Sequence, residues 1–203
     1  MFDKGNAMSD IKNFYEIAME KIAAIGDASE EEKLGWKYVP EGEKLAASCL
    51  NSNKEIENEI KKYDNQTRPF ILQGARKVLI ANIGLPKNDI SKKNTRKAMD
   101  SLLFISEDKD TVTAVFDKIN YIFEHYNTQG KQQKDQTYKL LEKEFQDKVN
   151  QALAQQTGTA NNVKVNVETL PQFKEEWNKV LMQIENQYAN YLNEYKKELA
   201  EIK

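Results

Sequence analysis

The chain is short of the residues on which most metal and redox sites depend. Its 203 residues include one cysteine, Cys49, and one histidine, His125. A structural zinc site needs about four Cys, His or carboxylate ligands, and a ferritin-like di-iron site needs a Glu-x-x-His pair on each of two helices. We therefore predict no cofactor and no metal site, although the residue counts leave an all-carboxylate magnesium site open. His125 is expected at the edge of a helix and Cys49 as a buried, inert thiol.

Glycine and proline are also scarce, with 8 and 4 residues, and the glycines form none of the familiar catalytic motifs. We find no GxGxxG, no GxxxxGK[ST], no GxSxG and no kinase set of motifs. The sequence therefore gives no support for phosphate binding by a glycine-rich loop or for acyl transfer by a nucleophile elbow. The prediction is a noncatalytic protein with no evident small-molecule substrate.

Long hydrophobic runs are missing. The most apolar stretch, residues 70–85, is interrupted by Gln73, Arg76, Lys77 and Asn82, whereas a membrane span needs about 18 consecutive apolar residues. The first ten residues lack a cationic segment followed by an apolar one, so we expect no signal peptide. The single cysteine agrees with a reducing compartment. These features predict a cytoplasmic protein that does not enter the membrane.

Charge, in contrast, is abundant and unevenly distributed. Residues 1–67 have a net charge of -5, residues 68–106 of +6 and residues 107–203 of -3. All three arginines lie in the basic segment 68–106. Whole-chain acidity and the acidic runs at residues 30–32 and 107–110 are able to neutralise this segment within the fold or across a dimer.

The apolar residues of the first half recur mostly at helical spacing. Ser29 and Glu32 have the spacing of a capping box, which opens a short helical turn ending near Leu34. Residues 35–42 contain two glycines and a proline and are expected to form a loop anchored by Trp36, Tyr38 and Val39. Helices are expected over residues 10–25, 41–50, 54–63, 69–82 and 89–105.

The second half is organised around a helix at residues 111–126. Its apolar stripe comprises Val112, Val115, Phe116, Ile119, Ile122, Phe123 and Tyr126. Gly130 allows either a turn or a continuous helix with a glycine that costs about 1 kcal/mol, and we favour the turn. A second helix then runs to about Gln156. Near residues 157–169 we expect a flexible linker in which Val163, Val165 and Val167 form a short extended segment.

The last helix is expected over residues 171–202 and would be about 48 Å long. The fold class is therefore all-α. We predict a helical cluster over residues 1–106, followed over residues 107–203 by an elongated antiparallel three-helix bundle with one very long C-terminal helix.

Two features suggest binding surfaces. The first is a set of cations, of which Lys93, Arg96 and Lys97 share one helical face. The full set is Lys87, Lys92, Lys93, Arg96 and Lys97. Such cations bind the phosphates of nucleic acids or ribosomal RNA, or an acidic protein, or serve as a solvated face.

The second feature is the row Tyr188, Tyr191 and Tyr195 on the last helix. Such a row is either the edge of a helical core or a protein interface, because tyrosine is enriched at binding hot spots. A helix of this length often needs a second chain to cover its far end. The functional hypothesis is a noncatalytic interaction or scaffold protein that binds a protein partner or itself. The alternative is a nucleic-acid- or ribosome-associated factor that uses residues 87–97.

Overall fold

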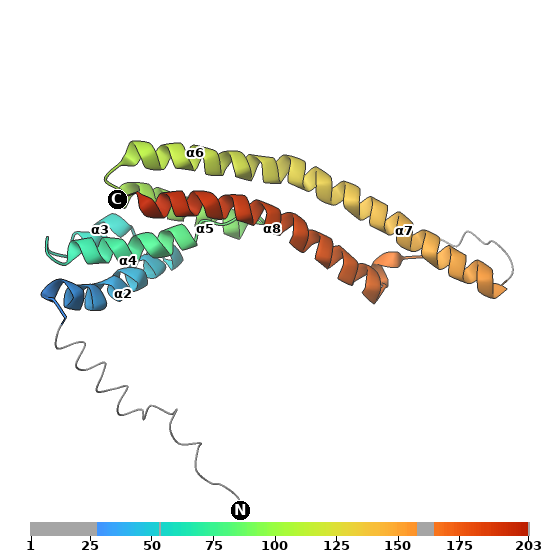
Figure 1. Cartoon of the computed structure of the whole chain (residues 1–203), viewed down its shortest axis with the longest axis horizontal. Helices are drawn as coiled ribbons and strands as arrows, with labels where there is room; N and C mark the ends of the chain where they lie inside the picture. The colour runs from blue at the N-terminus through green and yellow to red at the C-terminus, as the bar shows by residue number, and fades with distance from the viewer. Residues whose placement is uncertain (1–27, 53, 158–164, 203) are drawn as a thin grey trace, which may run out of the picture. The chain divides into compact units, whose positions relative to one another are not determined.

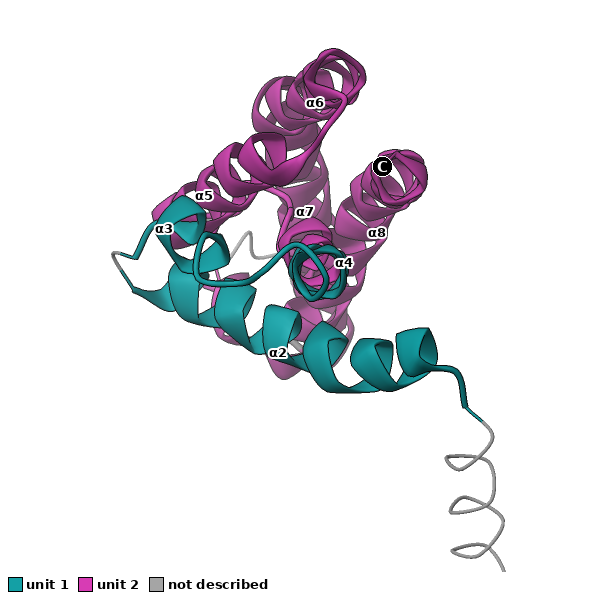
Figure 2. Ribbon diagram, turned by 90° about the vertical axis from the view of Figure 1, so that its left-hand side faces the viewer, with its two compact units in different colours: residues 1–75 teal, residues 76–203 magenta. Residues whose placement is uncertain are grey.

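The computed structural model describes residues 28–52, 54–157 and 165–202, so the helix expected at residues 10–25 lies outside the described residues. Each regular element in these ranges is a helix, which confirms the all-α prediction. The chain divides into two compact units, residues 1–75 and 76–203 (Figure 2). The first compact unit thus ends earlier than the predicted boundary at residue 106.

The first described helix corrects the expected loop at residues 35–42. Helix α2 (Glu30–Asn51) is continuous and contains Pro40. It begins with the predicted capping box, in which the Ser29 hydroxyl accepts from the Glu32 amide and the Glu32 carboxylate accepts from the Ser29 amide. Trp36 does not anchor a loop, because 52% of it is exposed.

Tertiary packing explains the glycines at Gly42 of α2 and Gly74 of helix α4 (Arg68–Ala81). Helix α3 (Ile56–Ile60) lies between α2 and α4 in the chain, and the division between the two units falls inside α4. A Cβ placed on Gly42 would lie 2.1 Å from the Ile71 carbonyl oxygen, and one on Gly74 would lie 2.0 Å from the Val39 carbonyl oxygen. The two backbones therefore approach more closely than any side chain would permit.

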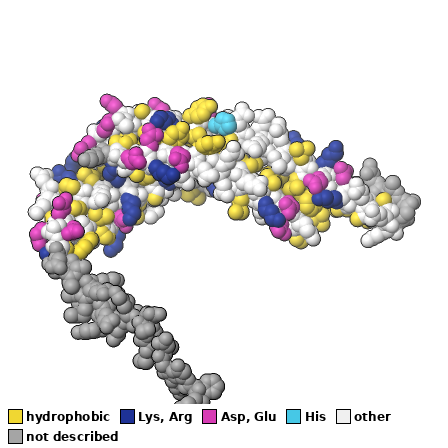
Figure 3. All heavy atoms as spheres, viewed as in Figure 1, with side chains coloured by type: hydrophobic (Ala, Val, Ile, Leu, Met, Phe, Trp, Pro, Cys, Tyr) yellow, Lys and Arg dark blue, Asp and Glu magenta, His cyan; other side chains and the backbone are white. Residues whose placement is uncertain are grey.

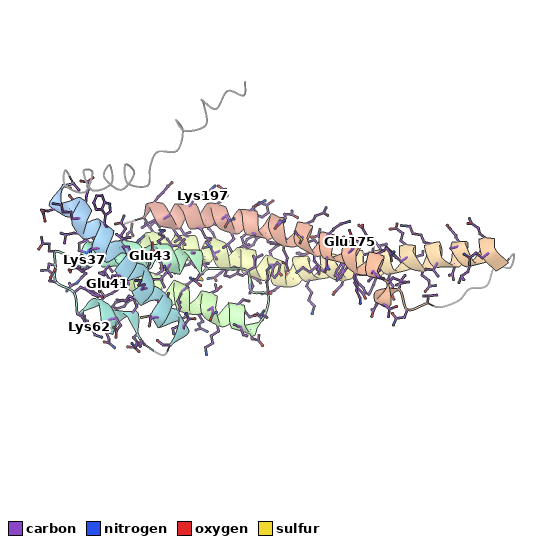
Figure 4. The ribbon with its side chains drawn as sticks, turned by 90° about the horizontal axis from the view of Figure 1, so that it is seen from below. Lys37, Glu41, Glu43, Lys62, Glu175 and Lys197 are labelled. Carbon is purple, nitrogen blue, oxygen red and sulfur yellow. The ribbon has the colours of Figure 1, made fainter. Side chains whose placement is uncertain are left out.

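Side-chain contacts complete the first unit. Tyr63 donates a hydrogen bond of 2.8 Å to a carboxylate oxygen of Glu41, which is marked on α2 in Figure 4. Burial and this neighbouring carboxylate together raise the pKa of Tyr63 to about 12. Buried Ala46, Cys49 and Ile71 lie on the facing helices α2 and α4.

The second unit is built on helices that follow the end of α4. Helix α5 (Asp89–Ile105) is capped by Asn88, and helix α6 (Lys109–His125) is capped by Asp108. A π-helical turn η1 (Tyr126–Gly130) joins α6 to helix α7 (Lys131–Thr157). A 3-10 turn η2 (Val167–Thr169) precedes helix α8 (Pro171–Glu201).

The predicted turn at Gly130 is wrong. The chain stays helical from α6 through η1 into α7, and α8 returns antiparallel along this run (Figure 1). A bundle of three helices does form, but its members are α5, α6 and α8, because α7 continues α6 instead of folding back on it. The glycine is accommodated because the Tyr188 side chain of α8 covers it, 3.2 Å from the position of an added Cβ.

The core of the second unit lies where α5, α6 and α8 meet. It contains the residues of the predicted α6 stripe, of which Val112, Val115, Phe116, Ile119 and Tyr126 are buried. The other helices supply Ala98, Met99, Leu102, Ile105, Ile184, Tyr188, Leu192 and Leu199. Ile90 of α5 is 73% exposed and takes no part in this core.

Two cations bind carbonyl groups at helix ends. The Arg76 guanidinium donates to the Ser106 hydroxyl at 3.1 Å and to the carbonyls of Leu199 and Ile202 at the end of α8. Lys196 donates to the carbonyls of Ala81 and Ile83, each at 2.9 Å, where α4 ends. Such donors satisfy carbonyls that have no partner within the helix. Burial lowers the pKa of both Arg76 and Lys196.

The expected extended segment near residues 163–167 differs from the structure. Val163 lies outside the described residues, and Val167 is buried in the 3-10 turn η2. The Val165 amide donates to the Gln146 side chain at 3.0 Å, so this part of the linker lies against α7. Edge-on aromatic contacts of Tyr138 with Phe173 and Trp177 join α7 to α8 nearby.

Candidate interaction surfaces

A polar cluster surrounds the π-helical turn. Nδ1 of His125 lies 2.9 Å from the Tyr188 hydroxyl, and the Tyr126 ring meets the Tyr188 ring edge-on with centroids 5.2 Å apart. Burial raises the pKa of Tyr188. The histidine thus bonds a neighbouring side chain at the edge of a helix, as its isolation in the sequence suggested. The aromatic rings that contact it are those of Tyr121 and Tyr188.

Glu185 of α8 also belongs to this cluster and contacts Lys87, Tyr126 and Lys134. Its carboxylate pairs with Lys87 at 2.5 Å and with Lys134 at 3.6 Å, and it accepts from the Tyr126 hydroxyl at 3.4 Å. Burial raises the pKa of Glu185, but the hydrogen bond and charge of Lys87 and the charge of Lys134 outweigh it, so the net pKa is lowered. Lys134 also donates to the Tyr126 hydroxyl at 2.8 Å. The π-helical turn is therefore fixed by interactions from both α7 and α8.

The sequence-predicted tyrosines divide between the inside and the outside of the unit. Tyr188 is buried, Tyr195 is half-buried and Tyr191 is 52% exposed. On α6, Tyr121 is 67% exposed, and its ring centroid lies 6.3 Å from that of His125. We call Lys118, Tyr121 and His125 of α6, with Tyr191 and Tyr195 of α8, the tyrosine face.

Two contacts across the helix pair bracket the tyrosine face. At one end the Lys118 ammonium lies 5.8 Å from the Tyr195 ring centroid and pairs with Glu198 at 2.7 Å. At the other end His125 contacts Tyr188. Tyr121 lies between Lys118 and His125, and Tyr191 between Tyr188 and Tyr195, so the two exposed rings share one side of the helix pair. Figure 3 shows hydrophobic side chains beside the histidine on this surface.

The rest of α8 differs from the tyrosine face. Glu175 and Lys197, marked in Figure 4, lie on a face of α8 without large exposed aromatic groups and pair with helical neighbours. Lys179 pairs with Glu175 at 3.0 Å, and Lys197 pairs with Glu194 at 2.9 Å. Exposed pairs of this kind form a solvated surface and contribute little to stability.

The sequence-predicted basic residues do not form a single patch. Lys87 is paired with Glu185 of α8. Lys92 and Arg96 of α5 have only long pairs within their own helix, with Asp89 at 3.7 Å and with Asp100 at 4.0 Å. Lys93 is exposed on the same helix, whereas Lys97 is half-buried and engaged with a neighbour. Four of the five predicted residues thus lie on α5.

Sequence reasoning missed Lys118 and Tyr121 as members of the tyrosine face. Tyr121 precedes His125 by four residues and Lys118 precedes it by seven, which places all three on one side of α6. The sequence contains this spacing. It does not contain the register of α6 against α8, which places Tyr121 on the same side of the helix pair as Tyr191.

The described residues contain no group of three or more His, Cys, Asp or Glu side chains able to hold a metal ion. Cys49 is buried in the first unit. No helix in the described ranges is long and apolar enough to cross a membrane.

The protein is therefore all-helical in its described residues, and a long helical run interrupted by a π-helical turn pairs with an antiparallel C-terminal helix. Residues 57–201 match a family of unknown function (DUF6657), and the chain belongs to that family. The match begins within α3 and includes the helices from α4 to α8. No curated protein and no solved structure matches the chain.

Proposed function

We propose that the protein is a noncatalytic helical interaction protein that self-associates through the tyrosine face. The observation that carries the proposal is the exposure of two large aromatic side chains, Tyr121 and Tyr191, on one side of the α6–α8 pair. Tyrosine supplies a large, rigid contact area at low entropic cost, and it is enriched at interface hot spots.

Charge on this side supports a second copy of the chain as the partner. Lys118 lies beside the exposed rings, and Glu198 is its partner on α8. A two-fold interface brings the same patch of each copy together, so a patch with both signs of charge is able to complement itself. The helices α6 and α8 also offer a rigid platform, because the α6–α8 contacts bury Ile119, Tyr188 and Leu192 beneath the face.

The first prediction concerns mass in solution. Light scattering coupled to gel filtration at two concentrations should give a mass above the 23.5 kDa of one chain, rising with concentration. Replacing Tyr121 and Tyr191 together by serine should shift the protein towards the monomer. Each truncation removes an aromatic ring from the interface, and a hot-spot ring is worth about 2 kcal/mol or more.

The matched control is Met182→Ser, which removes a large side chain that is 64% exposed on the same helix but outside the tyrosine face. Its mass profile should equal that of the unmodified protein. A monomer at every concentration, or equal effects of the serine pair and of Met182→Ser, would refute the proposal.

A second candidate function is binding of nucleic-acid phosphates by α5. It is supported by Lys92, Lys93 and Arg96, which are exposed. Lys92 pairs with Asp89 at 3.7 Å and Arg96 with Asp100 at 4.0 Å, and both of these long pairs lie within α5. Cations in weak ion pairs are readily transferred to phosphate groups. Their binding also releases the counterions that surround a nucleic acid. Lys87 contributes less to this surface because Glu185 holds it.

Charge reversal tests the second candidate. Fluorescence anisotropy with a single-stranded RNA and a duplex DNA should show binding that weakens by about 40-fold between 50 and 200 mM salt if three duplex phosphates are neutralised. Lys92→Glu, Lys93→Glu and Arg96→Glu combined should abolish it. The control reverses Lys131, Lys139 and Lys143 of α7, which changes the net charge equally. Equal loss in both triple variants would show general charge attraction and reject a site on α5.

A further inference from the structure

A groove of about 420 Å³ lies between α5 and α6 within the second unit. Four apolar side chains, Met99 and Leu103 of α5 with Phe116 and Phe123 of α6, supply most of its hydrophobic lining. Pockets for small ligands commonly measure roughly 300–1,000 Å³ and combine apolar walls with a few polar groups. This groove has the size and the apolar character of such a site.

The polar groups of the groove have a defined distribution. Lys92, Arg96 and Asp100 contribute charges from α5. Asn120 of α6 and Asn127 of η1 contribute side-chain amides. The Thr95 hydroxyl, which also lines the groove, is occupied by the amide and carbonyl of Gly84, each at 3.0 Å. The groove therefore has two cations against one carboxylate, together with donors from two asparagines.

The cations are available to a ligand. Arg96 is 4.0 Å from Asp100, and both side chains are largely exposed, at 86% and 75%. Lys92 is 3.7 Å from Asp89, which is fully exposed. Exposed ion pairs at these distances contribute little to stability. A ligand anion that also buries apolar surface therefore displaces Asp89 and Asp100 from the two cations.

We propose that this groove binds a small anionic amphiphile: a carboxylate on a linear alkyl chain. The chain lies on Met99, Leu103, Phe116 and Phe123, and the carboxylate is held by Arg96 and Lys92. Arg96 recognises it in the bidentate geometry that guanidinium groups form with carboxylates. The inference stands on the α5–α6 groove and does not depend on the tyrosine face.

The test uses the full chain, with sodium decanoate as the probe. Calorimetry measures the affinity of binding, and NMR of the methionine methyl groups locates the site. Decanoate should shift the methyl signal of Met99, which lines the groove, and leave that of Met182 on α8 unchanged. Affinity should rise about tenfold or more from octanoate to decanoate, because each buried methylene adds to the apolar transfer energy. Decanol and decyltrimethylammonium should bind at least tenfold more weakly than decanoate.

Substitutions separate the charges from the apolar wall. Arg96→Glu should weaken decanoate binding by at least tenfold, and Asp100→Asn should strengthen it severalfold because it removes the competing carboxylate. Asn120→Trp fills the groove without changing its charge and should abolish binding. Lys93→Glu is the matched control, because Lys93 is exposed on α5 but does not line the groove.

Three results would overturn the proposal. The first is equal binding of decanol and decanoate, and the second is equal weakening by Lys93→Glu and Arg96→Glu. The third is a Met99 methyl signal that decanoate leaves unmoved. Lys93→Glu also separates this site from the phosphate surface, since nucleic-acid binding should fall in that variant whereas decanoate binding should not.

Discussion

Replacing Gly42 or Gly74 by alanine should lower the free energy of unfolding of the first unit by about 2–3 kcal/mol each. An added methyl group would lie 2.1 Å from the Ile71 carbonyl oxygen in the first variant and 2.0 Å from the Val39 carbonyl oxygen in the second. Both contacts are with helical backbone, so a side-chain rotation cannot relieve them. Helices α2 and α4 must move apart, which reduces the packing of Ile71 and Ala46.

The double variant should cost less than the sum of the two single variants. Both glycines belong to one helix contact, so once the first methyl group has separated α2 from α4 the second meets less resistance. Chemical denaturation followed by circular dichroism measures all three free energies. Additive effects would mean that the two glycines act at separate contacts.

Gly35→Ala provides the matched control within α2. Its methyl group would lie 3.6 Å from the Phe70 ring, an ordinary van der Waals distance. Glycine in a helix costs about 1 kcal/mol relative to alanine, so this variant should be as stable as the natural chain or more stable. Destabilisation by Gly35→Ala similar to that by Gly42→Ala would contradict the close-approach explanation.

The same glycines show why the fold was only partly predictable. The cap at Ser29 and the apolar stripe of α6 follow local rules, and the structure has this cap and buries Val112, Val115, Phe116 and Ile119 of the stripe. Residues 35–42 were expected to be a loop because glycine and proline disfavour helices locally. The packing of α2 on α4 requires glycine at Gly42, and tertiary contacts override the local preference.

Gly130 shows that local rules are also insufficient to predict the structure of the second unit. Sequence alone gave the choice between a turn and a continuous helix, and local propensity favoured the turn. In the structure Tyr188 covers Gly130, while Lys134 and Glu185 hold Tyr126 at the start of the π-helical turn. These partners come from later in the chain, up to 59 residues away, and no local pattern contains them.

The residues of the candidate surfaces could be identified from the sequence, but their positions in space could not. The basic residues and tyrosines were identified from spacing, yet Tyr188 is buried and Lys87 is paired with Glu185. The α5–α6 groove depends on how two helices with separate stripes lie side by side. Phe123 was therefore assigned only to the apolar stripe of its own helix, and Asn120 gave no signal in the linear sequence. Helix register, set by the whole core, decides which side chains meet.

Phe116→Asp should unfold the second unit, whereas His125→Gln on the same helix should leave it folded. Phe116 is 7% exposed and packs in the α6 core, where loss of a large aromatic side chain costs about 3–5 kcal/mol. The aspartate adds the desolvation of a carboxylate without a partner. The combined cost is comparable to the whole stability of about 5–15 kcal/mol that a domain of this kind has.

His125→Gln should change the stability by less than about 1 kcal/mol, because the glutamine amide is able to replace the imidazole as the hydrogen-bond partner of the Tyr188 hydroxyl. Thermal unfolding followed by circular dichroism compares both variants with the natural chain. Phe116→Leu is the intermediate control: it retains an apolar side chain and should lower the melting temperature without abolishing the cooperative transition. Similar melting curves for Phe116→Asp and His125→Gln would place the buried face of α6 elsewhere, and a large loss in His125→Gln alone would make the polar cluster at the π-helical turn, rather than the apolar stripe, the main support of the helix pair.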